Sequence, residues 1–118
     1  MNGGRSVVNY CGHGSTTSWT TTGFNVSHVN ALLNDNMLPY IFSVACYNGM
    51  FGSTTCFAEA WLRATRSGEP IGAAATYMSS ISQSWDPPMD AQDEFTDLLV
   101  GTSAYGIKRT FGGLCYNA

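Results

Sequence analysis

Three short apolar segments, each followed by a segment with helical features, constrain the fold of this chain most strongly. The strand-like segments cover residues 6–10, 40–45 and 71–78. The middle segment is almost continuously apolar, which is typical of a strand that is covered on both faces. An alternation of strands and helices predicts an α/β fold, with a mainly parallel sheet, right-handed crossovers and helices packed on the faces of the sheet.

The helices and loops are expected between and after these strands. Ser27 is a suitable N-cap for a first helix. A second helix is expected at residues 56–66, and a third after Asp86, where a proline follows the N-cap. Residues 15–22, which are rich in Ser and Thr, and residues 79–89 are expected to be loops.

The composition excludes several classes of protein. Of the 118 residues, 44% are hydrophobic and only 11% are charged, which is the opposite of a disordered chain. The net charge is −3 and no basic run is present, so nucleic acid is not an expected partner. No stretch approaches the ~20 apolar residues that a membrane span needs, and the first residues do not form a signal peptide.

The four cysteines are widely and irregularly spaced, at Cys11, Cys46, Cys56 and Cys115. A disulfide framework needs a higher density of cysteine, and a zinc ribbon needs close pairs such as CxxC. Two or more of these thiols are therefore expected to be small buried hydrophobes.

Two chemically suggestive segments follow consecutive strands. His13 lies between two glycines after the first strand, and Cys46 follows the second. Ligands and chemistry gather at the carboxyl ends of parallel strands. A cysteine thiolate is a nucleophile, a histidine can protonate a leaving amine, and the N–H groups of Gly14 and Cys46 could bind an oxyanion. This set fits a cysteine peptidase. Ordinary core packing, or a zinc site that adds Cys11, are the alternatives.

Several ordered blocks of the sequence resemble the gingipain-type cysteine peptidases. The first two blocks are VVNYCGHGS at residues 7–15 and LPYIFSVACYNG at residues 38–49. Further blocks are CFAEA at residues 56–60, QSW at residues 83–85 and IKRTFGG at residues 107–113. The resemblance covers nearly the whole chain, and it is stronger to the arginine-specific branch of the family.

This resemblance implies a caspase-like α/β fold and an endopeptidase that cleaves after a basic residue, Arg in the arginine-specific branch, through a thioester acyl-enzyme. His13 matches the family's catalytic histidine, Cys46 its nucleophile and Gly14 a contributor to its oxyanion hole. Trp85 matches the tryptophan that lies over the aliphatic stem of the basic substrate side chain. The other residues that match the lining of this substrate-binding pocket are Gly12, Val44, Gln83 and Met89.

Residues 1–118 correspond to part of the family's catalytic domain, which has further strands before the histidine strand. The acid of the family's pocket and the carboxylate of its catalytic set precede the matching segment, so neither is carried over. Expected partners are protein or peptide substrates and the remainder of the catalytic domain. The resemblance implies no cofactor or metal for the chemistry, allows a structural calcium ion, and places the protein outside or on the surface of a bacterium. A non-catalytic binding or structural module with the same fold is the alternative.

Overall fold

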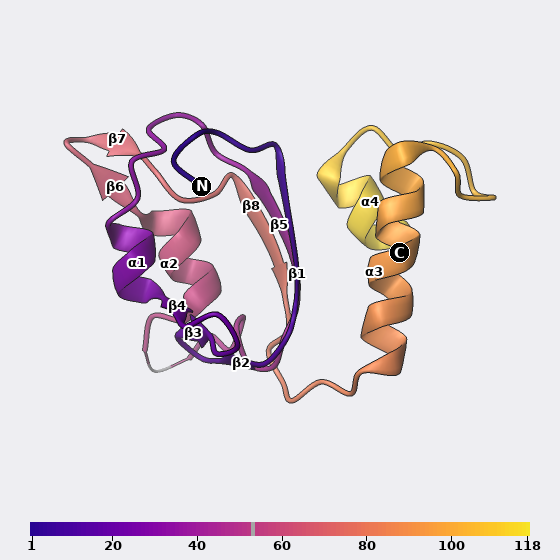
Figure 1. Cartoon of the computed structure of the whole chain (residues 1–118), viewed down its shortest axis with the longest axis horizontal. Coiled ribbons are helices and arrows are strands. Elements are labelled where there is room, and N and C mark those ends of the chain that lie inside the picture. The colour runs from indigo at the N-terminus through magenta and orange to yellow at the C-terminus, as the bar shows by residue number, and fades with distance from the viewer. Residues whose placement is uncertain (53) are drawn as a thin grey trace. The chain divides into compact units, whose positions relative to one another are not determined.

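The chain forms two compact units, residues 1–83 and residues 84–118, and each is described by itself. The computed structural model describes residues 1–52 and 54–118 (Figure 1). Within this part of the chain, no helix is long and apolar enough to cross a membrane.

A three-stranded parallel sheet is the framework of the first unit. Its strands are β1 (Val7–Cys11), β5 (Tyr40–Val44) and β8 (Ala75–Met78), in the order β1-β5-β8. Both pairings are parallel, which confirms the expected sheet. The central strand β5 is buried at four of its five residues, and this explains its continuous apolar run.

The third strand begins later than predicted, at Ala75 instead of residue 71. Gly72 has a φ of +87°, which turns the chain. The N–H groups of Ile71 and Ala73 donate to the carbonyls of Ala64 and Trp61, at 3.0 and 2.9 Å. Ile71 and Ala73 therefore bind the end of a helix, and only from Ala74, whose N–H donates to Pro39 O at 2.9 Å, does the segment follow the sheet.

Two helices of the first unit lie on the same side of the sheet (Figure 1). The helix α1 (Val26–Asn30) begins two residues before the predicted position, because Asn25 is its N-cap and accepts from the N–H groups of Ser27 and His28. The prediction of Ser27 as the N-cap of this helix was therefore wrong. An asparagine side chain caps a helix as well as a serine does.

The helix α2 (Phe57–Arg63) is shorter than the predicted segment 56–66. It begins after Cys56, whose N–H donates to Glu59 Oε2 at 2.8 Å. It ends early because β6 (Thr65–Arg66) pairs with β7 (Glu69–Pro70) in a hairpin. The hairpin turn is formed by Ser67 and Gly68, both with positive φ.

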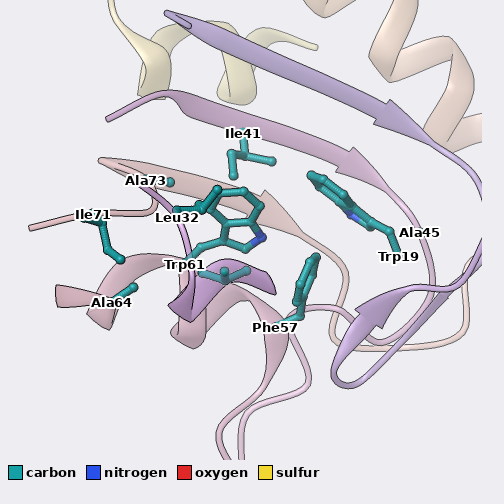
Figure 2. Close-up of a cluster of buried hydrophobic side chains, with 10 residues drawn as sticks. Trp19, Leu32, Ile41, Ala45, Phe57, Trp61, Ala64, Ile71 and Ala73 are labelled. Atoms are coloured by element: carbon teal, nitrogen blue, oxygen red, sulfur yellow. The ribbon is translucent and has the colours of Figure 1, made fainter. Parts of the chain in front are cut away.

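The core of the first unit lies between the sheet and these helices (Figure 2). Phe57 and Trp61 of α2 and Ile41 of β5 are 0% exposed. The ring of Trp19 packs against those of Phe57 and Trp61, with centroids 5.2 and 5.7 Å apart. Burial of such large aromatic side chains supplies much of the apolar surface that drives folding.

Trp19 belongs to a small antiparallel sheet in a segment that was expected to be a polar loop. Its strands are β2 (Gly14–Ser15), β3 (Ser18–Trp19) and β4 (Phe24–Asn25). The prediction of a loop was wrong because one aromatic residue among many polar ones anchors the segment: Trp19 is 4% exposed.

The second unit consists of α3 (Asp86–Val100) and α4 (Phe111–Asn117). The N-cap position of α3 is occupied by Trp85, one residue before the predicted Asp86, and prolines stand in the first turn as expected. Phe95 packs edge-to-face against Phe111, with ring centroids 6.1 Å apart. The helix α4, which the sequence did not predict, is capped by Thr110, whose Oγ1 accepts from Gly113 N–H.

Candidate active site

The candidate site lies where β1 and β5 end, at one edge of the parallel sheet. The N–H of Gly12 donates to the carbonyl of Val44 at 3.1 Å, so the pairing continues one residue past β1. His13 follows Gly12, and Cys46 follows two residues after Val44. The predicted placement of both residues at adjacent strand ends is therefore what the structure has.

Three hydrogen bonds fix the backbone of His13. Its N–H donates to Thr21 Oγ1 at 2.8 Å. Its carbonyl accepts from Tyr10 Oη at 3.0 Å and from Thr20 N–H at 2.9 Å. Since the side chain of His13 is exposed, the imidazole is presented at the surface from an anchored backbone.

The hydrogen bond from Tyr10 Oη to the His13 carbonyl requires a glycine at position 12. A Cβ at this position would lie 2.5 Å from Tyr10 Oη, which crosses over Gly12 to reach His13. Real Cβ atoms essentially never approach another heavy atom so closely.

The half-buried Cys46 side chain is held by the loop that follows β8. Its Sγ accepts from the N–H of Gln83 at 3.3 Å and also lies near Gln83 O and Ser82 Oγ, at 3.8 and 3.9 Å. The next residue, Tyr47, has a φ of 60°, and its N–H donates to Ile81 O at 3.1 Å. The loop after β8 thus surrounds the sulfur that follows β5.

Gly14 brings the histidine segment against the cysteine segment. A Cβ at Gly14 would lie 2.7 Å from the carbonyl oxygen of Cys46 and 2.8 Å from Ala45 Cβ. Only a residue without a side chain permits this approach of two backbones. The structure therefore gathers six predicted site residues at one edge of the first unit, namely Gly12, His13, Gly14, Val44, Cys46 and Gln83.

The two remaining predicted residues belong to the second unit. Trp85 precedes α3, and Met89 lies in the first turn, where its N–H donates to Trp85 O at 3.0 Å. Both side chains are exposed, at 44% and 41%. An exposed indole face is a surface on which a cation or its aliphatic stem can stack.

The other three cysteines differ from Cys46 in their surroundings, and all four are free thiols. Burial raises the pKa of the Cys56 thiol, and it raises the pKa of Cys115 to about 11. Both therefore stay protonated at neutral pH and are poor nucleophiles. Cys11 is exposed at the end of β1.

Across residues 1–52 and 54–118, no three His, Cys, Asp or Glu side chains gather closely enough to hold a metal ion. The alternative zinc site of Cys11, His13 and Cys46 is therefore not formed.

Some residues that shape the site were not found from the sequence. Tyr10 and Thr21 hold His13, and Asn48 is buried beside Gly14. Asn48 precedes Gly49, and this pair signals a turn but not a buried side chain.

Comparison with known proteins identifies the family of the chain. The family model of peptidase family C25 matches residues 1–118. Gingipain R2 of Porphyromonas gingivalis is 52% identical over 118 residues, which are 99% of this chain and 16% of that protein. Lys-gingipain of the same species is 30% identical over 115 residues, or 96% of this chain and 6% of that protein. The stronger similarity to the arginine-specific branch is thus confirmed.

Solved structures show the same fold. The Arg-specific cysteine proteinase gingipain R matches 98% of this chain and 27% of that one, with a TM-score of 0.93 and 52% identity. The complex of the pro- and mature domains of RgpB of Porphyromonas gingivalis matches with a TM-score of 0.90 and 50% identity, over 98% of this chain and 28% of that one. The expected α/β fold, with its mainly parallel sheet flanked by helices, is confirmed, and the chain spans about a sixth of the length of gingipain R2.

Proposed function

We propose that this chain, which belongs to peptidase family C25, carries the nucleophile and the acid–base residue of a cysteine endopeptidase that cleaves after basic residues, Arg in particular. The observation that carries the proposal is the contact of Gly14 with the Cys46 carbonyl, because it sets the His13 segment directly against the Cys46 segment. Similarity to an Arg-specific proteinase at 52% identity supports the choice of substrate.

The proposed reaction begins with Cys46. Its thiolate sulfur attacks the carbonyl carbon of the scissile bond, and the negative charge moves to the carbonyl oxygen. The N–H groups of Gly14 and Cys46 stabilise this oxyanion. The hydrogen bond from Gln83 N–H to Cys46 Sγ, at 3.3 Å, supports this role because it orients the sulfur.

His13 completes both halves of the reaction. As imidazolium it donates a proton to the leaving amine, so that the C–N bond breaks and a thioester with Cys46 remains. As neutral imidazole it then takes a proton from water, whose oxygen attacks the thioester. The C–S bond breaks, the acid is released, and the Cys46 thiolate and the His13 imidazolium are restored. The three hydrogen bonds to its backbone support this role, because they anchor the main chain that carries the ring at the sheet edge.

The basic side chain of the substrate would be bound by Trp85. The exposed indole of Trp85 supports this assignment, since an aromatic face attracts a guanidinium. The substrates would be proteins or peptides, and the protein would act outside or on the surface of a bacterium.

Cleavage of peptide amides by the intact protein tests the proposal. A peptide with Arg before the scissile bond should be cleaved faster than the matched Lys peptide, and one with Gln at that position should resist. Cys46→Ser and His13→Ala should each lower kcat by at least 10³-fold, while Cys11→Ser should match the parent protein. Unchanged cleavage in Cys46→Ser would refute the proposed nucleophile. A correctly folded parent protein that cleaves none of the peptides would instead favour a non-catalytic module.

A further inference from the structure

Asn48 lies two residues after Cys46, and the proposed reaction does not use it. Its side chain is completely buried, with 0% exposed. Its Nδ2 donates two hydrogen bonds, to Ser15 O at 2.7 Å and to Ser18 O at 2.9 Å. Both protons of the amide are thus bound to the backbone of the β2–β3 hairpin.

The oxygen of the same amide faces the central strand of the sheet. Asn48 Oδ1 accepts from Ser43 Oγ at 3.3 Å. Ser43 Oγ in turn accepts from Trp19 Nε1 at 2.9 Å. A single carboxamide therefore joins the hairpin to β5, inside a region where an unpaired polar group is costly.

The hairpin that Asn48 binds begins directly after His13, because β2 starts at Gly14. A Cβ at Gly14 would meet the Cys46 carbonyl at 2.7 Å and Asn48 Nδ2 at 3.0 Å. The amide thus sits under the point where the two segments touch. Any movement of the hairpin along the sheet edge would shift His13 relative to Cys46.

We infer that Asn48 is a positioning residue for the peptidase reaction, because it clamps the hairpin that follows His13 to the turn that carries Cys46. This inference rests on the proposed function of His13 and Cys46. The amide is the suitable group, because two donors and one acceptor are needed within one short side chain. A carboxylate of the same shape offers no donor to the two hairpin carbonyls.

The test is a double-mutant cycle with His13. The readout is the second-order rate constant for alkylation of Cys46 in the intact protein by an arginyl chloromethyl ketone. In this reaction the sulfur bonds to the methylene carbon and chloride leaves. Asn48→Ala should lower the rate constant at least tenfold in the parent protein and by less than twofold in the His13→Ala background. A residue that acts through His13 has nothing left to position once the imidazole is gone.

Two further variants distinguish a loss of positioning from a failure of the protein to fold. Asn48→Ser keeps one donor and should lower the rate constant three- to tenfold. The control Ser43→Ala leaves both bonds from Asn48 to the hairpin in place, and a loss of at most threefold is expected. All variants are measured well below their thermal unfolding midpoints.

Two results would overturn the inference. One is a rate constant for Asn48→Ala and Asn48→Ser equal to that of the parent protein. The other is an equal loss in the parent and His13→Ala backgrounds, because a purely structural residue lowers both rates alike. If His13→Ala itself labels as fast as the parent protein, the proposed function fails and the positioning role falls with it.

Discussion

Substitution of Gly14 by Ala should weaken both the fold and the proposed reaction, because this glycine alone lets the two segments touch. The added Cβ would lie 2.7 Å from the Cys46 carbonyl oxygen, whereas ordinary contacts begin at 3.4 Å, so the two backbones must separate by about 0.7 Å. The φ of Gly14 is not positive, so alanine meets no backbone strain there and the effect comes from crowding.

The magnitude follows from two opposing contributions. Overpacking costs about 1–3 kcal/mol, and the reduced entropy of the unfolded chain returns about 0.4–1 kcal/mol. We therefore expect the free energy of unfolding to fall by about 1–2 kcal/mol. The effect on rate is larger, because misplacement of reacting groups by 1 Å can slow a reaction on the order of 10²-fold.

The assay combines chemical denaturation with alkylation of Cys46 by the arginyl chloromethyl ketone. Gly14→Ala should lower the alkylation rate constant between ten- and a hundredfold. Gly52→Ala is the matched control, because nothing lies within 4 Å of the added Cβ and its φ is not positive. An alkylation rate for Gly14→Ala equal to that of Gly52→Ala would show that close contact at Gly14 does not position His13 and Cys46.

Two further predictions concern titrating groups. The hydrogen bond from Cys56 N–H lowers the pKa of Glu59 below 4.5, so this carboxylate stabilises the fold above that pH, and the contribution is lost as pH falls through the lowered pKa. Glu59→Ala should therefore lower the thermal unfolding midpoint at pH 7 and make the midpoint less dependent on pH in the acid range, as measured by circular dichroism. A midpoint at pH 7 equal to that of the parent protein would show that the bond from Cys56 N–H to Glu59 does not stabilise the start of α2. Burial raises the pKa of Cys115 from 9.0 to about 11, so the folded chain keeps this proton and loses stability as pH rises from 9 toward 11. At pH 8, iodoacetamide should modify Cys115 at least tenfold more slowly than the exposed Cys11, as followed by peptide mass spectrometry; equal rates would contradict the burial.

The parallel sheet could be predicted because its strands are short, apolar and bounded by turn residues. Residues 40–45 carried this signal most clearly, since a central strand is apolar on both faces. The small sheet of β2, β3 and β4 could not be predicted in the same way. Its strands have two residues each and are joined by Thr-rich turns, and the burial of Trp19 that anchors it depends on residues far away in the sequence.

The candidate site, too, could be predicted only in part. His13 and Cys46 could be placed together because each follows a strand of the same parallel sheet. The contacts that fix them are tertiary. The sequence signals a turn at Asn48, but its burial between Ser15 and Ser43 follows only from the packing of the hairpin against β5.

The roles of Cys46 and His13 are tested together by mapping the site at which the arginyl chloromethyl ketone modifies the intact protein, by mass spectrometry of its peptides. Nucleophilic attack by Cys46 predicts one adduct, on Cys46, whose formation His13→Ala suppresses, while the exposed Cys11 stays unmodified. An adduct that forms on Cys11 at least as fast as on Cys46, or a Cys46 that reacts no faster than free cysteine, would contradict it.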